Sequence, residues 1–213
     1  MKPVVLVVLT LAVFTTAEQL HCKPKSANIP TDWLDMVDPC VKKMKSQIQE
    51  ELKASLQYLA MGAYFSKDTV NRPGFAKSFF ESASEEREHA IKLISYLLMR
   101  GGLTKDVRSL IRKNVPVTKT SWSNGVEALK DALILEASVT KKIRDVIKVC
   151  ESPNGNNFND YHLVDYLTGD FLEEQYKGQK EIATKISILD KLMDQHGPLG
   201  EFLFDKKLLN GEL

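Results

Sequence analysis

The sequence predicts an all-α protein arranged as a four-helix bundle with one long crossover. Glycine and proline fall almost entirely between segments, and no alternating pattern typical of a β-strand is sustained. Apolar residues instead recur at helical spacing in four segments of similar length, which favours a bundle. These segments cover roughly residues 41–65, 75–100, 123–150 and 160–195.

The first two predicted helices are bounded by loop residues. The second starts after the sequence NRPG, residues 71–74, and stops at the paired glycines Gly101 and Gly102. The apolar stripe of the first helix is Val41, Met44, Ile48, Leu52 and Leu59. The stripe of the second is Phe75, Phe79, Ala83, Ala90, Leu93 and Leu97. Each helix is therefore expected to bury one face.

The third predicted helix ends at the loop sequence SPNGNN, residues 152–157, and the fourth at HGPLG, residues 196–200. The stripe of the third is Val126, Leu129, Leu133, Thr140, Ile143 and Ile147. The stripe of the fourth is Val164, Leu167, Phe171, Ile182, Ile186 and Leu189. A short apolar helix is expected at about residues 199–208.

The connections between the helices predict their order in space. The first link and the third are short, so each joins an antiparallel pair. The second link, about residues 102–122, is longer than a compact domain needs for a simple turn. A crossover that runs the length of the bundle explains it and gives an up-down-down-up order with a short fifth helix.

Each predicted helix carries a polar side chain near its midpoint, on the face that should be apolar. In the third helix this residue is Glu136. In the second it is Glu86, and His89 lies one turn further along on the same side. Glu51 and Gln175 occupy the corresponding positions of the first and fourth helices.

This set of inward polar residues points to a metal ion. A single glutamate at the edge of a stripe more often reaches solvent or an arginine, but a fully buried carboxylate is costly unless it is paired or bound to metal. Three carboxylates and one histidine share the middle of this bundle, and no lysine or arginine occupies a matching stripe position. Oxygen-rich ligands with one imidazole suit iron or manganese better than structural zinc.

The N-terminus is predicted to be a signal peptide. Lys2 precedes the apolar run at residues 4–14, and small residues lead to a cleavage point after Ala17. The run is too short to span a bilayer, and the alternative is a buried N-terminal strand. We therefore expect a secreted protein with a signal peptide at 1–17, an N-terminal extension at 18–40 and a helical domain at 41–213.

The net charge and the cysteine content indicate which kinds of binding partner to expect. Cleavage would remove one lysine and leave equal numbers of basic and acidic side chains, so no nucleic acid or membrane partner is expected. The three cysteines, Cys22, Cys40 and Cys150, would meet an oxidising compartment, and their odd number suggests an intermolecular bridge or a free thiol. A local bridge between Cys22 and Cys40 and a bridge to another subunit both remain open.

The pattern of inward ligands resembles the ferritin family. Ferritin-like di-iron proteins carry one glutamate on each of two helices and a Glu-x-x-His pair on each of the other two. Here Glu51 and Glu136 match the single glutamates, and Glu86 with His89 matches one pair. The second pair is missing, because Lys177 stands where its histidine is expected. This departure is similar to the eukaryotic ferritin heavy chain, where a glutamine takes that helix's place and the second iron is held loosely.

The resemblance covers nearly all of the chain after residue 17. The segments that carry it are EELKASLQYLAMGAYF (50–65), FFESASEEREHAIKL (79–93), ALILEASV (132–139), FLEEQ (171–175) and LGEFLFDKKLL (199–209). The signal peptide, the cysteines and the extended N-terminus resemble the secreted heavy-chain homologues of insects. The last helix resembles the one that lines the fourfold axis of a 24-subunit shell.

The resemblance implies a ferroxidase that oxidises Fe(II) with O2 at a transient dinuclear site and passes it to a ferric oxyhydroxide mineral inside the shell. Self-assembly is implied, together with a light-chain-like partner joined by an interchain disulfide. The implied catalytic residues are Glu51, Tyr58, Glu86, His89, Glu136 and Gln175, and the implied metal ligands are Glu51, Glu85, Glu86, His89, Glu136 and Gln175. Glu86 would bridge the two irons, and Tyr58 would be oriented on Glu86 or on a bound oxygen species.

Two further family features match less completely. Asp165 and His162 correspond to the threefold entry channel, but Thr168 stands where a second acid is usual. Glu81 and Glu88 are candidates for mineral nucleation, with a solvated surface as the alternative.

The competing functions are a shell or iron-transport subunit without turnover, and a secreted four-helix signalling protein. Subunits of the first kind lose the ligands that this chain keeps, and bundles of the second usually have two long crossovers.

Overall fold

The computed structural model describes residues 27–102, 110, 116–152 and 159–213. The chain divides into two units, residues 1–31 and residues 32–213, and all the helices below belong to the second. Among the described residues there is no strand, and none of their helices is long and apolar enough to cross a membrane. The predicted signal peptide and Cys22 lie outside the described residues.

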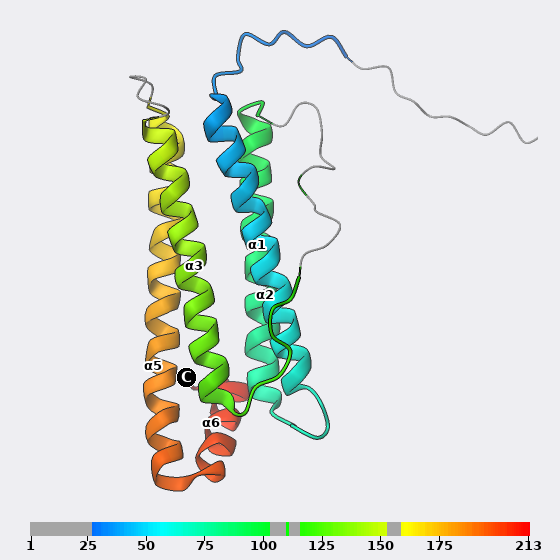
Figure 1. Cartoon of the computed structure of the whole chain (residues 1–213), viewed down its shortest axis with the longest axis vertical. Coiled ribbons are helices and arrows are strands. Elements are labelled where there is room, and N and C mark those ends of the chain that lie inside the picture. The colour runs from blue at the N-terminus through cyan, green and yellow to red at the C-terminus, as the bar shows by residue number, and fades with distance from the viewer. Residues whose placement is uncertain (1–26, 103–109, 111–115, 153–158) are drawn as a thin grey trace, which may run out of the picture. The chain divides into compact units, whose positions relative to one another are not determined.

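Four long helical segments of the second unit form the bundle in the predicted up-down-down-up order (Figure 1). The helices are α1 (Asp38–Phe65), α2 (Pro73–Met99), α3 (Gly125–Glu151) and α5 (Glu173–His196). Helix α1 packs against α2 and α3, and α3 packs against α5. Helix α3 begins at the end of the bundle where α2 also begins (Figure 1). The predicted fold class is confirmed.

The fourth segment is not the single α-helix that the sequence predicts. It consists of α4 (Tyr161–Tyr166), a π-helical turn η3 (Leu167–Leu172) and α5. In an α-helix, residues four apart drift around the axis by about 40° per step, which would rotate a row of such residues away from the core. A π-turn has more residues per turn and cancels this drift. Leu163, Leu167, Phe171 and Gln175 accordingly stay in one buried row.

The same drift explains a wrong prediction in α1. Leu59, expected in the buried stripe, is 49% exposed, because successive steps of four carried that stripe around the helix. The buried face continues instead through Tyr58, Met61 and Phe65. Two apolar clusters result, one containing Met44 and the other containing Phe65.

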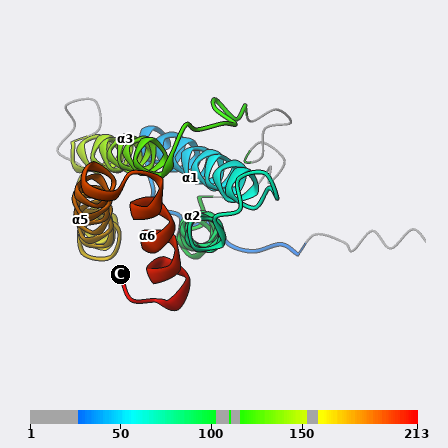
Figure 2. The same cartoon turned by 90° about the horizontal axis from the view of Figure 1, so that it is seen from below.

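Helix α6 (Pro198–Asn210) crosses the end of the bundle and packs against α2 and α5 (Figure 2). Two of its carboxylates cap other helices. Asp205 Oδ1 accepts a hydrogen bond from the backbone N–H of Phe75 at 3.0 Å, and Glu201 Oε2 accepts one from Gly125 N–H at 2.9 Å. Helix N-termini otherwise leave such N–H groups unsatisfied, so these contacts fix α6 to the starts of α2 and α3.

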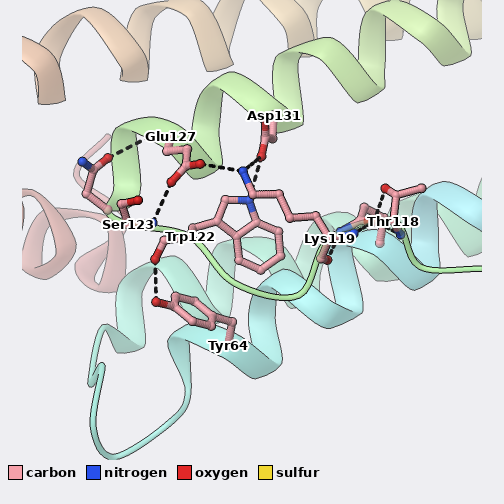
Figure 3. Close-up of polar contacts among 9 residues, drawn as sticks. Tyr64, Thr118, Lys119, Trp122, Ser123, Glu127 and Asp131 are labelled. Atoms are coloured by element: carbon pink, nitrogen blue, oxygen red, sulfur yellow. Dashed lines mark hydrogen bonds and ion pairs between the residues drawn. The ribbon is translucent and has the colours of Figure 1, made fainter.

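The C-terminal end of the crossover is held by a polar network (Figure 3). Lys119 Nζ lies 2.7 Å from Glu127 Oε1 and 2.6 Å from Asp131 Oδ2, both on α3. The indole N–H of Trp122 donates to the same Asp131 carboxylate at 2.8 Å, and the Tyr64 hydroxyl donates to the Trp122 carbonyl. These contacts tie the crossover to α1 and α3.

The cysteine pairing corrects one of the two alternatives raised by the sequence. Cys40 and Cys150 form a disulfide within the chain, so the local bridge between Cys22 and Cys40 is excluded. Cys40 is in the first turn of α1 and Cys150 in the last turn of α3, and both are buried. This pairing could not be predicted from the sequence, because the two cysteines are 110 positions apart and come together only when the bundle forms.

Candidate metal centre

The structure brings three of the predicted site residues together in the middle of the bundle. Glu51 on α1 and Glu86 and His89 on α2 each offer one ligand atom, and these atoms lie within 4.8 Å of one another. All three side chains are buried, Glu51 completely. The helical spacing of Glu86 and His89 places both on the α2 face that packs against α1.

One atom of each of these residues has no hydrogen-bond partner in the described part of the chain. The atoms are Glu51 Oε2, Glu86 Oε2 and His89 Nδ1, and all three are shielded from solvent. The other oxygen of Glu51 accepts a hydrogen bond from Gln47 Nε2 at 2.8 Å. Glu86 Oε2 and His89 Nδ1 lie 3.8 Å apart, too far for a hydrogen bond. Buried polar atoms are almost always paired, so three buried residues that bring ligand atoms together and each keep one atom without a hydrogen bond form an arrangement that a cation would complete.

The pKa values of the buried carboxylates also favour a bound cation. Burial, reinforced by the charge of Glu136, raises the pKa of Glu86 from 4.5 to about 8. Burial and the charge of Glu86 raise the pKa of Glu51 well above its ordinary value. Like charges in a desolvated site oppose ionisation, and a cation between the carboxylates reverses that effect.

Glu136 and Tyr58 form the α3 side of the centre. The Tyr58 hydroxyl donates a hydrogen bond to Glu136 Oε1, and both side chains are buried. The resemblance implies that Tyr58 is oriented on Glu86 or a bound oxygen species, whereas the side chain that accepts its hydrogen bond in the structure is Glu136. Burial and the charge of Glu136 raise the pKa of Tyr58 well above its ordinary value, which keeps the phenol protonated.

Gln175 closes the centre from α5. The hydroxyl of Thr140 lies 2.7 Å from Gln175 Oε1, and the Nε2 group of Gln179 donates to that hydroxyl at 2.6 Å. Thr140 belongs to the predicted apolar stripe of α3, but its polar role was not predicted. Because a hydroxyl at a stripe position occupies little more room than a methyl group, only its partners on α5 reveal that role.

The remaining acidic candidates lie at the rim. Glu81, Glu85 and Glu88 are all exposed. Glu81 and Glu85 line a pocket between the helices that also contains Glu86 and His89, and Glu88 does not. Glu174, not predicted as a site residue, has Oε2 3.4 Å from His89 Nε2 and 3.7 Å from Lys92 Nζ. Its place beside Gln175 in the EEQ sequence was the available signal.

A pocket of about 200 Å³ is lined by most of the candidate site residues, although Glu51 is not among them. The site residues in its lining are Tyr58, Glu81, Glu85, Glu86, His89, Glu136, Glu174 and Gln175. Carboxylate and amide oxygens with one imidazole are hard or borderline donors, and they suit a first-row divalent metal such as iron. The donor set and the unpaired ligand atoms therefore fit iron.

Comparison with known proteins agrees with this architecture. A family model described as a ferritin-like domain matches residues 41–192. The chain is 63% identical over 199 residues to the ferritin heavy chain of Trichoplusia ni, with 93% of each chain covered. It is 57% identical over 202 residues to that of Drosophila melanogaster, covering 94% of this chain and 96% of that one.

A solved ferritin structure has the same fold as this chain. The crystal structure of Trichoplusia ni secreted ferritin superimposes with a TM-score of 0.84 and 64% identity, covering 89% of this chain and 97% of that one. The helix order, the inward ligands and these matches lead to one conclusion: this chain belongs to the ferritin family, with insect ferritin heavy chains among its relatives.

Proposed function

We propose that this chain is a ferroxidase subunit of a secreted iron-storage shell. The observation that carries the proposal is that the buried side chains of Glu51, Glu86 and His89 bring their ligand atoms within 4.8 Å of one another, while each keeps one buried atom without a hydrogen bond. Family membership supports iron as the metal, and the heavy-chain names of the relatives support oxidation as well as storage. Iron here is the substrate and not a resident cofactor.

The proposed reaction balances with iron and oxygen alone. Two Fe(II) ions each lose one electron, and O2 accepts both electrons together with two protons to leave as hydrogen peroxide. The two Fe(III) ions hydrolyse with four water molecules to ferric oxyhydroxide, and four protons are released in total. The product moves to the interior of the shell as mineral.

Each side chain has a proposed part in this reaction. Glu51 and His89 hold the first Fe(II), Glu86 bridges to the second, and Glu136 binds the second. The protein's carboxylates must lose their protons to bind metal, so the raised pKa of Glu86 couples iron entry to proton release. Glu85 at the rim supplies a carboxylate on the way in or out.

The proposed role of Gln175 follows from its chemistry. A neutral amide oxygen binds Fe(III) more weakly than the carboxylate and imidazole of a second Glu-x-x-His pair would. The fourth helical segment lacks that pair, because residue 177 is a lysine where the pair would have its histidine. The Lys177 side chain is exposed and forms an ion pair with Glu173. We infer that the second iron is held loosely enough to leave after oxidation.

We further propose the boundaries and assembly of the subunit. Residues 1–17 are the signal peptide, residues 18–40 an extension and residues 41–213 the di-iron domain. The relative named secreted ferritin supports export, and its family supports assembly into a shell, for which we propose 24 subunits. Cys22 is the cysteine left for a bridge to a light-chain-like partner, since Cys40 and Cys150 pair within the chain.

The proposal is tested by stopped-flow absorbance after aerobic Fe(II) is mixed with the assembled metal-free shell. The wild type should give a fast diferric signal, and the double substitution Glu86→Ala, His89→Ala should abolish it without changing the native mass. The matched control is Glu212→Ala, His196→Ala, which removes the same residue types from exposed positions. Absence of a fast signal in the wild type would instead favour a shell or transport subunit without turnover.

A further inference from the structure

The contacts of Thr140 define which way the Gln175 amide faces. The Thr140 hydroxyl lies 2.8 Å from the backbone carbonyl oxygen of Glu136, 2.7 Å from Gln175 Oε1 and 2.6 Å from Gln179 Nε2. A hydroxyl carries one hydrogen and accepts up to two hydrogen bonds. In this arrangement two carbonyl-type oxygens compete for one hydrogen, while one lone pair of the hydroxyl is unused.

A half-turn of the Gln175 amide removes this conflict. The terminal oxygen and nitrogen of an amide have nearly the same size, and their hydrogen-bond partners distinguish them. With its nitrogen toward Thr140, Gln175 donates to the hydroxyl, Gln179 donates to it as well, and the hydroxyl gives its hydrogen to the Glu136 carbonyl. Each of the three contacts then joins a donor to an acceptor.

We propose that Thr140, held by Gln179, is a positioning residue that turns Gln175 Oε1 into the iron site as a ligand atom. Gln175 lines the same pocket as Glu86, His89 and Glu136. Apart from the Thr140 contact, its side chain forms no hydrogen bond with the described residues. The end of the amide that faces away from Thr140 is therefore free, and only an oxygen at that end can bind a cation.

The helix geometry explains why these three residues meet. The η3 turn keeps Phe171 and Gln175 in one row, and Gln179 follows one turn later on the same side. That row packs against α3, where Thr140 follows Glu136 by one turn. A threonine at residue 140 thus reaches both glutamines, and its own contact with the Glu136 carbonyl fixes its rotamer.

This inference rests on the proposed function and refines one ligand of its second iron. With the hydroxyl intact, the amide oxygen is fixed before the metal arrives. Without it, the amide can turn its nitrogen toward the site, and nitrogen of a neutral amide does not bind a cation. Residues that orient metal ligands in this way typically change metal affinity by about 10–100-fold when they are mutated.

Thr140→Val tests the proposal, because it removes the hydroxyl and keeps the shape. Anaerobic calorimetric titration of assembled, metal-free shells with Fe(II) should show two tight sites per subunit in the wild type. In Thr140→Val, the first site should be unchanged and the second at least about tenfold weaker. Thr140→Ser should restore the second site, and Gln179→Leu should weaken it less than Thr140→Val does.

The matched control is Thr184→Val on α5. Its hydroxyl also donates to the carbonyl four residues earlier, that of Lys180, at 2.9 Å, but it is exposed and has no contact with the site. Equal second-site affinity in Thr140→Val and wild type would overturn the inference, as would failure of Thr140→Ser to rescue. If the wild type bound no Fe(II), the proposed function itself would fail, so the two failures are distinguishable.

Discussion

The hydroxyl of Tyr58 on α1 donates a hydrogen bond to Glu136 Oε1 on α3 across the middle of the bundle. Both side chains are buried, so water does not replace either partner. The phenol thereby holds one oxygen of Glu136 and leaves the other for the pocket. A tyrosine of α1 thus sets the position of a proposed ligand on α3 without binding metal itself.

Tyr58→Phe is expected to slow iron oxidation. The substitution leaves a buried carboxylate oxygen without its donor, which costs about 1–3 kcal/mol and favours another rotamer of Glu136. We expect the initial stopped-flow rate to fall by about tenfold, with the native mass unchanged. Tyr161→Phe is the control, because Tyr161 is 76% exposed. A wild-type rate in Tyr58→Phe would contradict the positioning of Glu136 by the phenol.

The metal-free shell is expected to lose stability as the pH rises. The pKa values of Glu51 and Glu86 are raised in the folded chain, that of Glu86 to about 8, so the folded state binds more protons than the unfolded state above pH 4.5. The stabilisation is complete below the unfolded pKa and is lost as the pH passes through the folded values. Melting temperatures of the metal-free shell should therefore fall between pH 5 and pH 8.

Glu86→Gln should flatten this pH dependence. The neutral amide removes a titrating group from the buried cluster and relieves the repulsion that Glu51 experiences. We expect the largest gain in melting temperature near pH 8 and little gain near pH 5. Glu88→Gln, at an exposed position of the same helix, should leave the profile unchanged. A profile of the wild type that rises with pH over this range would show that the carboxylates are ionised before metal binds.

The sequence predicted the helices and the inward placement of most candidate site residues, because both depend on local periodicity. Glu86 and His89 interrupt an otherwise apolar stripe, so the helical spacing of that stripe predicts that both side chains face the core of the bundle. The apolar stripe of α1 predicts its buried face only in part: Glu51 and Tyr58 are buried as expected, but Leu59, expected in the core, is 49% exposed.

Features that depend on contacts between distant segments could not be predicted. The partner of Tyr58 depends on the rotation of α1 relative to α3, and the Cys40–Cys150 bridge joins residues 110 positions apart. The η3 turn has no distinct composition, since its sequence LTGDFL also fits an α-helix. The polar role of Thr140 depends on α5 and is invisible in the stripe of α3.

Gly74→Ala should loosen the packing of α6 on α2. A Cβ atom at residue 74 would lie 1.9 Å from the backbone oxygen of Asp205 and 2.9 Å from the backbone nitrogen of Leu209, so α6 would have to move. Overpacking of this kind costs about 1–3 kcal/mol or more, and the Asp205 cap on Phe75 would be lost as well. Thermal unfolding should show a clear loss of stability.

Gly178→Ala is the matched comparison and should have the opposite sign. Gly178 is inside α5, and a Cβ atom at residue 178 would meet nothing within 4 Å, so alanine gains helix propensity without a clash. The expected gain is about 0.5–1 kcal/mol. Equal effects of the two substitutions would show that α6 does not press on the start of α2.

Removal of the Cys40–Cys150 bridge should destabilise the bundle at the end where α1 begins. The bridge closes a loop with a sequence separation of 110, and loss of a native disulfide typically costs about 2–5 kcal/mol. The double substitution Cys40→Ser, Cys150→Ser avoids a new free thiol. We expect a lower melting temperature under non-reducing conditions and none of the wild type's sensitivity to reductant. Identical melting curves would contradict a stabilising role for the bridge.

Cys22 should account for any covalent link between subunits. Since Cys40 and Cys150 satisfy each other, Cys22 is the cysteine of this chain left to form such a link. Purified shells should give a disulfide-linked dimer band on a non-reducing gel, and Cys22→Ser should remove it. The Cys40→Ser, Cys150→Ser variant should keep the band, because it leaves Cys22 intact. Monomer bands alone from the wild type would contradict the interchain bridge, and a band that persists in Cys22→Ser would place it on the bundle cysteines.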